Sequence, residues 1–435
     1  MKEKTLFYLI IIPLIVCGFS QSKADTGCLP VAGVSNEFLI NQERNSPIDS
    51  LIEKPKLKSS AYHLHRSGLP NSFIQFERGK KGRVAFLGGS ITYNGGWRDS
   101  LTNYLQKRFP ETAFDFIAAG IPSMGSTCDV FRLERDVLMN GPVDLLFVEA
   151  AVNDGAKGRS NEEQMRSMEG IVRKVRRANL STDVLFMYFV DPYKIKEYNN
   201  GETPQVIQNH DEVANHYNLP AINLAKEVTD RIAANEFTWK DDFKNLHPSP
   251  FGQGVYAHSI ISFFEDAWSG SVSDDDKIID YVMPDELDSN CYDNGVLIPA
   301  RNVGLKKGWK FNENWIPADT ALTRNNYTKV PMLIGKFPGK ALKLKFEGDA
   351  VGIAIAAGPD AGTIEYRIDD EKWQKKDLFT KHSSRYHLPW YYTLADGLEP
   401  KKHVLQIRLI DAKNVKSQGS YCRIRYFYVN KLKLN

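Results

Sequence analysis

The sequence has 435 residues, of which 42% are hydrophobic and 25% are charged, and its formal net charge is +3 at pH 7. This composition is typical of a soluble globular protein that is long enough for two domains. So small a charge over such a length gives no electrostatic reason to expect nucleic acid or an anionic membrane as the main partner. Small neutral or weakly charged substrates fit the composition better.

The first 24 residues predict an export signal. Two lysines precede an apolar run over residues 6–16, and residues 22–24 have the small-x-small pattern that signal peptidase cuts. The run is short for a membrane core of about 30 Å, so we expect cleavage before Asp25 and no membrane-spanning helix in the mature chain. Lipidation of Cys17 is the alternative. Either way, the protein is expected to be periplasmic or secreted.

Cysteine spacing gives neither a zinc motif nor a redox motif, because no pair has the Cys-x-x-Cys pattern. After removal of the signal, Cys28, Cys128, Cys291 and Cys422 would remain. Export permits disulfides, and a bond between Cys291 and Cys422 is the most natural pairing since both lie in the C-terminal region. Buried thiols without a disulfide are the alternative.

After an N-terminal extension over residues 25–81, the segment 82–270 alternates short apolar runs with longer amphipathic stretches. This alternation is typical of parallel β/α units and predicts a doubly wound, flavodoxin-like three-layer α/β/α domain with a parallel sheet. The predicted strands are 84–87, 114–118, 145–148, 184–190 and 221–224. Helices are predicted over 97–108 and 162–178, and a third begins at Pro250.

The composition changes after Trp268, where small and acidic residues indicate a linker over residues 271–300. From 301 to 435 the hydrophobic period approaches two, which predicts a β-sandwich of about eight strands. Its clearest strand-length runs are 342–346, 351–356, 363–368, 404–409 and 422–429.

The first predicted strand of the α/β domain runs into Gly88-Gly89-Ser90 and then into a helix. Ser90 therefore stands at the carboxyl end of a strand, the edge at which open α/β sheets bind ligands. The two glycines permit a tight turn that presents the hydroxyl to a substrate. Ser90 is a candidate nucleophile, although taken alone this sequence is more often an ordinary turn.

Two further segments reach the same edge. The second predicted strand ends at Gly120, whose N–H can turn towards a ligand, and the third is followed by Asn153, whose side chain carries two amide hydrogens. With the N–H of Ser90 they would supply the three donors that a tetrahedral oxyanion needs. Judged alone, Asn153 is more simply a helix cap or a turn residue.

His247 lies on a short lead-in to the helix that begins at Pro250. Ser249 is the expected N-cap and Pro250 the first helical residue, so the helix start is well defined. An imidazole in this position can reach Ser90 and act as its general base. A solitary histidine before a helix is usually structural, so the assignment depends on the other three sites.

Gly-x-Ser, Gly, Asn-Asp and His-Pro, in this order and spacing, resemble the four sequence blocks of the SGNH/GDSL hydrolase superfamily over residues 83–268. The resemblance implies that Ser90 is the nucleophile, that Ser90, Gly120 and Asn153 form the oxyanion hole, and that His247 is the base. It implies no cofactor and no metal. The superfamily spans esterases, lipases, thioesterases and some acyltransferases.

One position departs from this family, which usually places Asp three residues before the histidine, where this sequence has Lys244. A loop slightly longer than usual would bring Asp242, or alternatively Asp241, to His247 as the third catalytic residue, and we favour Asp242. A Ser-His dyad with a backbone carbonyl orienting the ring is an equal alternative. Both aspartates could also form only a solvated acidic turn.

The C-terminal segment is rich in aromatic residues, which in a β-sandwich are mostly core but can also stack on sugar rings. They are Trp309, Trp315, Trp373, Trp390, Tyr391 and Tyr392. Residues 362–370 and 398–408 resemble the accessory jelly-roll modules that accompany carbohydrate acetylesterases. This resemblance implies a supporting domain that shapes the cleft or holds a glycan.

We therefore expect a serine esterase that removes acetyl groups from an oligo- or polysaccharide through an acyl-enzyme. One alternative is a lipid esterase or O-acyltransferase of the same fold. The other is a non-catalytic glycan-binding protein on a decayed hydrolase fold, of which Lys244 would be the sign. The four intact sites argue against decay.

Overall fold

The computed structural model describes residues 57–432. The expected export signal, the candidate lipidation site Cys17 and the thiol of Cys28 lie outside these residues. Within them, no helix is both long enough and apolar enough to cross a membrane.

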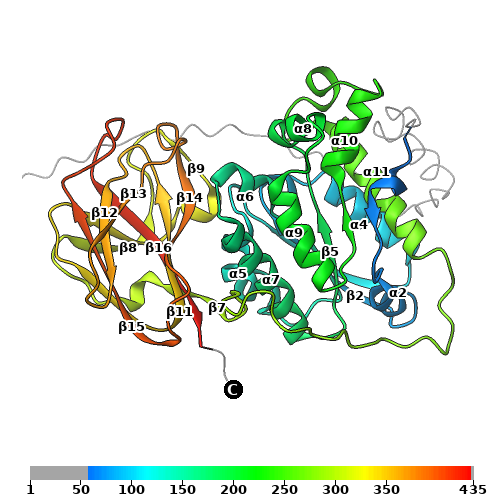
Figure 1. Cartoon of the computed structure of the whole chain (residues 1–435), viewed down its shortest axis with the longest axis horizontal. Helices are drawn as coiled ribbons and strands as arrows, with labels where there is room; N and C mark the ends of the chain where they lie inside the picture. The colour runs from blue at the N-terminus through cyan, green and yellow to red at the C-terminus, as the bar shows by residue number, and fades with distance from the viewer. Residues whose placement is uncertain (1–56, 433–435) are drawn as a thin grey trace, which may run out of the picture. The chain divides into compact units, whose positions relative to one another are not determined.

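A six-stranded sheet with the order β1-β6-β5-β4-β2-β3 forms the centre of the first domain (Figure 1). Its strands are β1 (His63–Leu64), β2 (Lys81–Gly88), β3 (Ala113–Gly120), β4 (Leu145–Glu149), β5 (Asp183–Met187) and β6 (Ala221–Ile222). Strands β2 to β6 pair in parallel and are the five predicted strands. The short β1 pairs antiparallel with β6, and it was not predicted because two residues carry no period.

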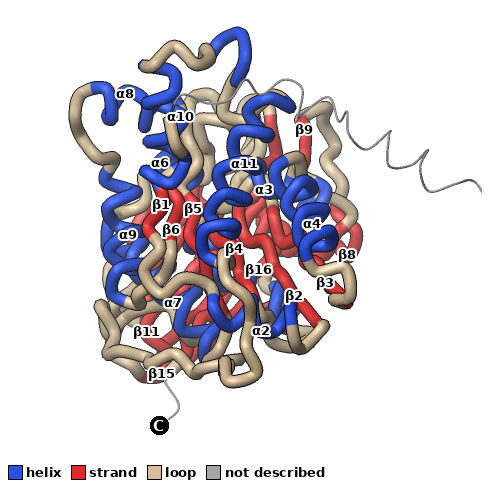
Figure 2. The backbone as a smooth tube through the Cα atoms, turned by 90° about the vertical axis from the view of Figure 1, so that its right-hand side faces the viewer, coloured by secondary structure: helices blue, strands red, loops and turns tan. Residues whose placement is uncertain are grey.

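Helices cover both faces of this sheet. α4 packs against α11 on one face, and α7 packs between α5 and α9 on the other (Figures 1 and 2). The helices are α2 (Pro70–Glu77), α3 (Ser90–Tyr93), α4 (Trp97–Arg108), α5 (Ser126–Leu133), α6 (Ala151–Lys157), α7 (Asn161–Ala178), α8 (Pro192–Asn199), α9 (Gln205–His216), α10 (Leu224–Ala233) and α11 (Pro250–Ala267). The predicted three-layer α/β/α architecture is thus confirmed.

The apolar runs of β4 and β5 follow from this layering. Every residue of both strands is buried, as expected for central parallel strands that have helices on each side. Phe86 of β2 stacks on Phe147 of β4 with ring centroids 4.9 Å apart, and the indole of Trp97, the first residue of α4, packs against both. This core holds the central strands that carry the candidate site.

The segment between the two sheets follows the first domain for much of its length. Its acidic residues 274–276 are exposed, as expected of a linker. Further on, the hydroxyl of Tyr281 donates to Asp183 at 2.5 Å, and the N–H of Leu287 donates to Glu169 at 2.7 Å. The segment expected as a linker also contains β7 (Gly295–Pro299), which pairs with the last strand of the chain.

The C-terminal domain is built of antiparallel strands, as predicted. Besides β7 they are β8 (Trp309–Trp315), β9 (Leu322–Thr323), β10 (Val330–Lys336), β11 (Leu342–Ala357), β12 (Thr363–Ile368), β13 (Gln374–Asp377), β14 (Tyr386–Ala395), β15 (Lys401–Ile410) and β16 (Tyr421–Lys431). One pair, β9 with β14, is parallel.

The two runs predicted as separate strands, 342–346 and 351–356, form the single strand β11. Its first half pairs with β15, and its second half pairs with β14 and β16. The strand changes partner at Gly348 without a turn. Only glycine fits at this position, because a Cβ would stand 1.9 Å from the carbonyl oxygen of Asn430. Glycine and aspartate between two strand-like runs indicated a turn, whereas the structure has a register shift inside one strand.

The predicted disulfide between Cys291 and Cys422 is wrong, because the two thiols form no bond with each other. The carbonyl of Cys291 accepts a hydrogen bond from Asn430 at 3.1 Å. Asn430 and Cys422 lie eight residues apart on β16, which corresponds to about 26 Å along a strand. The buried thiol of Cys422 packs instead in the apolar core of the C-terminal domain.

Candidate active site

The carboxyl ends of three neighbouring strands meet at one edge of the parallel sheet. In register, Gly88 of β2 lies beside Gly120 of β3 on one side and beside Glu149 of β4 on the other. The segments that follow these strands therefore leave the sheet next to one another. They carry Ser90 and Asn153, as the sequence predicts.

Ser90 and His247 are in direct contact. The distance from Ser90 Oγ to His247 Nε2 is 2.7 Å, a short hydrogen bond between residues 157 positions apart. Ser90 is the first residue of α3, and His247 precedes α11, where Ser249 caps the helix by accepting from the N–H of Gly252 at 3.3 Å. Ser90 is half-buried and His247 is exposed, so a substrate can approach both.

Asn153 and Gly120 also reach the turn that carries Ser90. A Cβ on Gly89 would stand 2.1 Å from Asn153 Nδ2, so the amide lies directly against the glycine before Ser90. A Cβ on Gly120 would stand 2.5 Å from the backbone nitrogen of Tyr93, in the same helical turn as Ser90. The structure thus brings together Ser90, Gly120, Asn153 and His247, as the sequence predicts. Gly89 and Gly120 have to be glycine, because neighbouring atoms leave no room for a Cβ.

The structure does not bring Asp242 or Asp241 to His247. The carboxylate of Asp242 accepts from the N–H of Thr238 at 2.7 Å and from its hydroxyl at 3.0 Å. These bonds close the short π-helix η3 (Trp239–Phe243), and Lys244 follows with a left-handed backbone (φ +80°) and an exposed side chain. Within residues 57–432, no hydrogen bond joins an acidic side chain to the His247 ring.

His247 is instead influenced by a positive charge from the C-terminal domain. Desolvation lowers the pKa of His247, and the guanidinium of Arg324 lowers it further. Arg324 directly precedes the 3₁₀ turn η5 (Asn325–Tyr327), and its Nε has no hydrogen-bond partner in the described part of the chain. The imidazole is therefore neutral at pH 7, the state in which Nε2 can accept the proton of Ser90.

A buried arginine holds the end of β2, directly before the turn that carries Ser90. Arg132 of α5 donates to the carbonyl of Gly88 at 3.2 Å and forms ion pairs with Asp129 at 2.7 Å and Asp136 at 2.9 Å. Both Arg132 and Asp129 are fully buried, so the guanidinium is matched by charge as well as by hydrogen bonds. Sequence reasoning missed Arg132, and its only signal was the spacing of Asp129 and Asp136 at i−3 and i+4 from it.

Asp154, next to Asn153, joins α6 to two other elements. One carboxylate oxygen accepts from the N–H of Ser126 at 3.0 Å, and the other lies 3.1 Å from His210 Nε2. Burial alone would raise the pKa of Asp154, but the hydrogen bond and the charge of His210 outweigh it and hold the pKa below its ordinary value. Asp154 is thus a positioning residue for the helix that presents Asn153, a role that no sequence pattern indicates.

A hollow of about 430 Å³ is lined in part by Ala156, three residues beyond Asn153 on α6. Lys157 of α6 and the aromatic residues Trp390 and Tyr392 of β14 line it. The Lys157 ammonium lies 4.4 Å from the centroid of the Trp390 ring, a cation–π distance. The C-terminal domain therefore supplies aromatic surface close to the candidate site.

The other predicted aromatic residues have different roles. Trp309, Trp315 and Tyr391 are core residues. The ring of Trp373 is covered by two guanidinium groups, whose carbons lie 4.8 Å (Arg367) and 4.1 Å (Arg408) from its centroid.

Comparison with known proteins finds one matching family model and several crystal structures of similar fold. Residues 86–255 match the model of the GDSL-like lipase/acylhydrolase family. Comparison with curated proteins gives no match. Two crystal structures of a two-domain esterase, CEX, described as active on acetylated mannans, are similar to this chain.

One of these structures has a TM-score of 0.71 and 22% identity, covering 87% of this chain and 100% of the other. The second, co-crystallised with mannopentaose, has a TM-score of 0.66 and 24% identity, covering 83% of this chain and 94% of the other. At these identities the match shows a shared two-domain fold.

Proposed function

We propose that the protein is a serine esterase that removes acetyl groups from carbohydrate, on the ground that residues 86–255 match the model of the GDSL-like lipase/acylhydrolase family. The observation that carries the proposal is the contact of 2.7 Å between Ser90 Oγ and His247 Nε2 at the carboxyl edge of the sheet. A hydroxyl next to an accessible neutral imidazole is the arrangement that activates a serine for acyl transfer.

In the first step Ser90 Oγ attacks the ester carbonyl while His247 Nε2 takes the hydroxyl proton. The carbonyl oxygen becomes an oxyanion, which the N–H groups of Ser90 and Gly120 and the amide of Asn153 stabilise. Loss of one such donor typically costs about 2.7–4 kcal/mol of transition-state stabilisation. His247 then gives its proton to the ester oxygen of the sugar as its bond to the acyl carbon breaks, so the sugar leaves as a free hydroxyl and an acetyl-enzyme remains.

In the second step a water molecule attacks the acetyl-enzyme. His247 removes its proton and returns one to Ser90 Oγ as acetate leaves, so the enzyme is regenerated without a cofactor. We assign this chemistry to a Ser90–His247 dyad rather than a triad, since the carboxylate of Asp242 accepts hydrogen bonds from Thr238 and not from His247.

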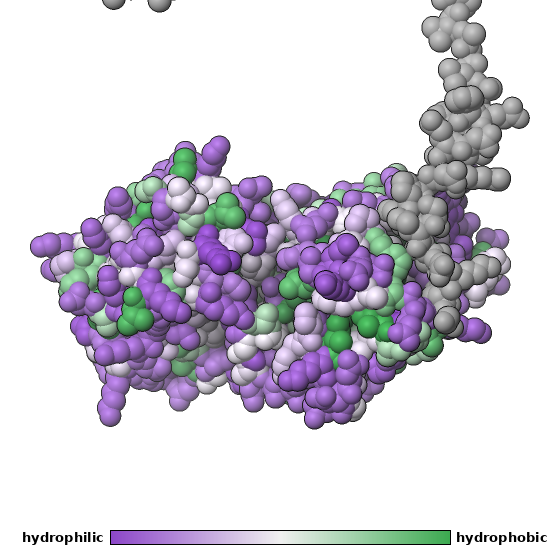
Figure 3. All heavy atoms as spheres, turned by 90° about the horizontal axis from the view of Figure 1, so that it is seen from above, coloured by the Kyte–Doolittle hydropathy of each residue, from purple (hydrophilic) through white to green (hydrophobic). Residues whose placement is uncertain are grey.

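The proposed substrate class is an acetylated oligo- or polysaccharide. Three observations support it: the aromatic hollow beside α6, the polar surface around this end of the sheet, and the fold shared with an esterase active on acetylated mannans. Figure 3 shows the molecule from the side on which α8 lies, and hydrophobic side chains appear there as separate patches among polar ones. A sugar polymer suits such a surface better than a long acyl chain does. We also propose export, on the sequence of residues 1–24.

The test combines active-site labelling with a substrate screen. A fluorophosphonate probe should label the native chain and not Ser90→Ala, whereas Ser100→Ala, a half-buried serine on α4, should label normally. Acetylated mannan, acetylated xylan and long-chain esters are then compared for released acid. We expect acetate from a polysaccharide, and loss of more than about 10³-fold in kcat/KM for Ser90→Ala and His247→Ala.

Failure of the native chain to react with the probe would leave a glycan-binding protein as the better assignment. Labelling with faster release of long-chain acids would instead favour a lipid esterase. Transfer of the acyl group to an added alcohol in preference to water would identify an O-acyltransferase.

A further inference from the structure

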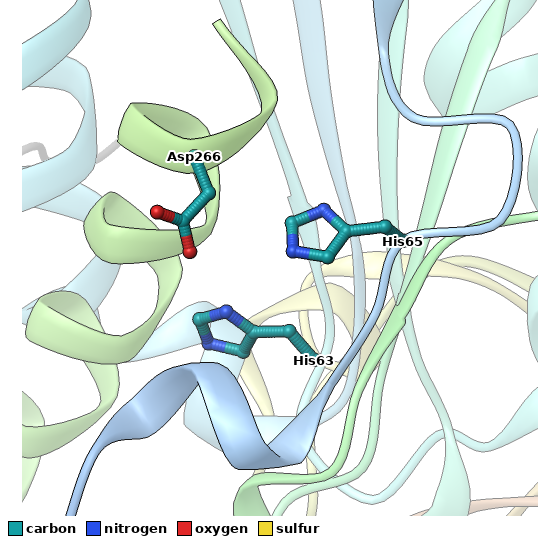
Figure 4. Close-up of side chains that lie close together, drawn as sticks. All are labelled: His63, His65 and Asp266. Atoms are coloured by element: carbon teal, nitrogen blue, oxygen red, sulfur yellow. The ribbon is translucent and has the colours of Figure 1, made fainter. Parts of the chain in front are cut away.

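Two histidines and an aspartate converge at the edge of the α/β domain, away from the candidate active site. They are His63 in β1, His65 one residue beyond it, and Asp266 in the last turn of α11 (Figure 4). One ligand atom from each lies within 4.8 Å of those of the other two. His63 and His65 are two residues apart on extended chain, so their rings project to the same side.

A buried hydrogen-bond chain sets the tautomer of His63. The hydroxyl of Ser259 donates to Glu227 at 2.6 Å, so its oxygen accepts the hydrogen bond that joins it to His63 Nε2 at 3.1 Å. His63 Nε2 therefore carries the proton of the neutral ring, and Nδ1 carries the lone pair. Metal-binding histidines usually have such a partner on their second nitrogen.

The other ring nitrogen of His63, Nδ1, is a buried polar atom whose hydrogen-bonding capacity is unsatisfied among the described residues. His63 is only 8% exposed, and its Nδ1 has no hydrogen-bond partner among the described residues. A buried nitrogen without a partner costs free energy, so its retention calls for an explanation.

Aromatic packing holds both rings in place. Phe263 of α11 stacks on His65 with centroids 4.6 Å apart and meets the edge of His63 at 5.4 Å. Asp266 lies one helical turn further along α11, on the same side as Phe263. The aspartate is exposed, so its carboxylate can move the short distance that ligation needs.

We propose that His63, His65 and Asp266 bind a divalent transition-metal ion, with Zn²⁺ as the reference ion. Two imidazoles and one carboxylate are a donor set that Zn²⁺ accepts, with water completing a tetrahedron. Zinc ligands at about 2.0–2.2 Å from the ion lie roughly 3.3 Å apart, so the ligand atoms need to draw together by up to about 1.5 Å. Mg²⁺ and Ca²⁺ prefer all-oxygen ligands and would not bind well here.

The ion would join the edge strand to the helix behind the candidate base. Asp266 lies 16 residues beyond Pro250, which corresponds to about 24 Å along α11, so a metal here does not reach Ser90 or His247. Its proposed role is structural: it fixes the short strand β1, which the rest of the sheet holds through only one neighbour, to the far end of α11. The site therefore does not depend on the proposed esterase activity.

The test uses the untagged chain after removal of metals with a chelator, because a polyhistidine tag would itself bind zinc. Elemental analysis after addition of Zn²⁺ and gel filtration should find one ion per chain. At Zn²⁺ about a hundredfold above the dissociation constant, Tm should rise by about 5 °C. His65→Ala and Asp266→Asn should lose both the ion and the rise.

Two matched controls lie on the same helix. His258→Ala removes an exposed imidazole, and Glu265→Gln removes the charge next to Asp266, and both should bind Zn²⁺ as the native chain does. Asp266→Asn keeps the size of the side chain, so it decides the question even if His65→Ala fails to fold. Absence of bound Zn²⁺, equal binding by Asp266→Asn, or an equal rise in Tm with Ca²⁺ would each overturn the proposal.

Discussion

Among the individual residues, His247 has the least usual environment. Its Nε2 lies 2.7 Å from Ser90 Oγ, while the charge that shifts its pKa is the positive one of Arg324. In a triad, the carboxylate stabilises the imidazolium that forms in the transition state. Here the exposed ring can share that charge with water instead, which a dyad requires.

Asp242→Ala therefore tests the dyad. In a triad, loss of the acid lowers kcat by about 10⁴, whereas we expect Asp242→Ala to keep kcat/KM close to the native value. The change should nevertheless cost about 1 kcal/mol of stability, because it removes the acceptor of two hydrogen bonds from Thr238. Steady-state kinetics and thermal unfolding measure the two effects. Asp241→Ala is the matched control, and a loss of several orders of magnitude in either variant would identify the missing acid.

The convergence of Ser90, Gly120, Asn153 and His247 could be predicted because each stands at a strand end or helix start that local sequence defines. The contacts of Asp242 could not be predicted, because the conformation of one loop decides its partner. The bonds to Thr238 and the left-handed backbone of Lys244 fix that loop, and neither has a pattern in the sequence.

The turn from β2 into α3 is the element on which the site depends. It packs so closely that Gly89 has no room for a side chain: a Cβ would meet Asn153 Nδ2 at 2.1 Å and the carbonyl oxygen of Met124 at 3.1 Å. Any residue larger than glycine must therefore displace the amide that we assign to the oxyanion hole. Gly88 is needed for a separate reason, because a Cβ there would meet the hydroxyl of Thr92 at 2.7 Å and the carbonyl oxygen of Glu149 at 2.8 Å.

Gly89→Ala should lower kcat by about 10²–10³, the usual cost of one oxyanion donor, with a smaller change in KM. Gly155→Ala is the matched control on α6, because its Cβ would find its nearest neighbour at 3.7 Å, an ordinary contact. That variant should keep its activity and gain up to about 1 kcal/mol of stability from the lower entropy of the unfolded chain. Equal activity of the two variants would show that Asn153 has no part in catalysis.

For the whole molecule, the two domains share an apolar core. The rings of Phe131 in α5 and Tyr428 in β16 lie 4.4 Å apart, and Trp315 and Tyr391 belong to the same buried cluster as the α/β sheet. Sequence patterns predicted both architectures, because hydrophobic period is a local property. They did not predict this packing, because a buried aromatic residue gives the same signal whichever domain it packs against.

Polar contacts reinforce the packing next to the candidate site. Arg159 donates to the carbonyl of Tyr391 at 3.0 Å, and Thr393 donates to Glu163 at 2.8 Å. These bonds join the segment after α6 and the first turn of α7 to β14, the strand that also presents Trp390. The C-terminal domain is thereby held where Arg324 can act on His247.

Arg324→Gln should move the acid limb of the kcat/KM–pH profile to higher pH. The guanidinium disfavours the protonated imidazole, so its removal raises the pKa of His247, and the base is then lost to protonation at a higher pH than in the native enzyme. The variant should be slower on the acid side and close to native above neutral pH. Arg385→Gln, an exposed arginine of the same domain, should leave the profile unchanged. Added salt should narrow the gap between native and variant profiles, since screening weakens the charge that the native enzyme retains. A limb that stays in place, or moves to lower pH, would mean that the C-terminal domain does not tune the base.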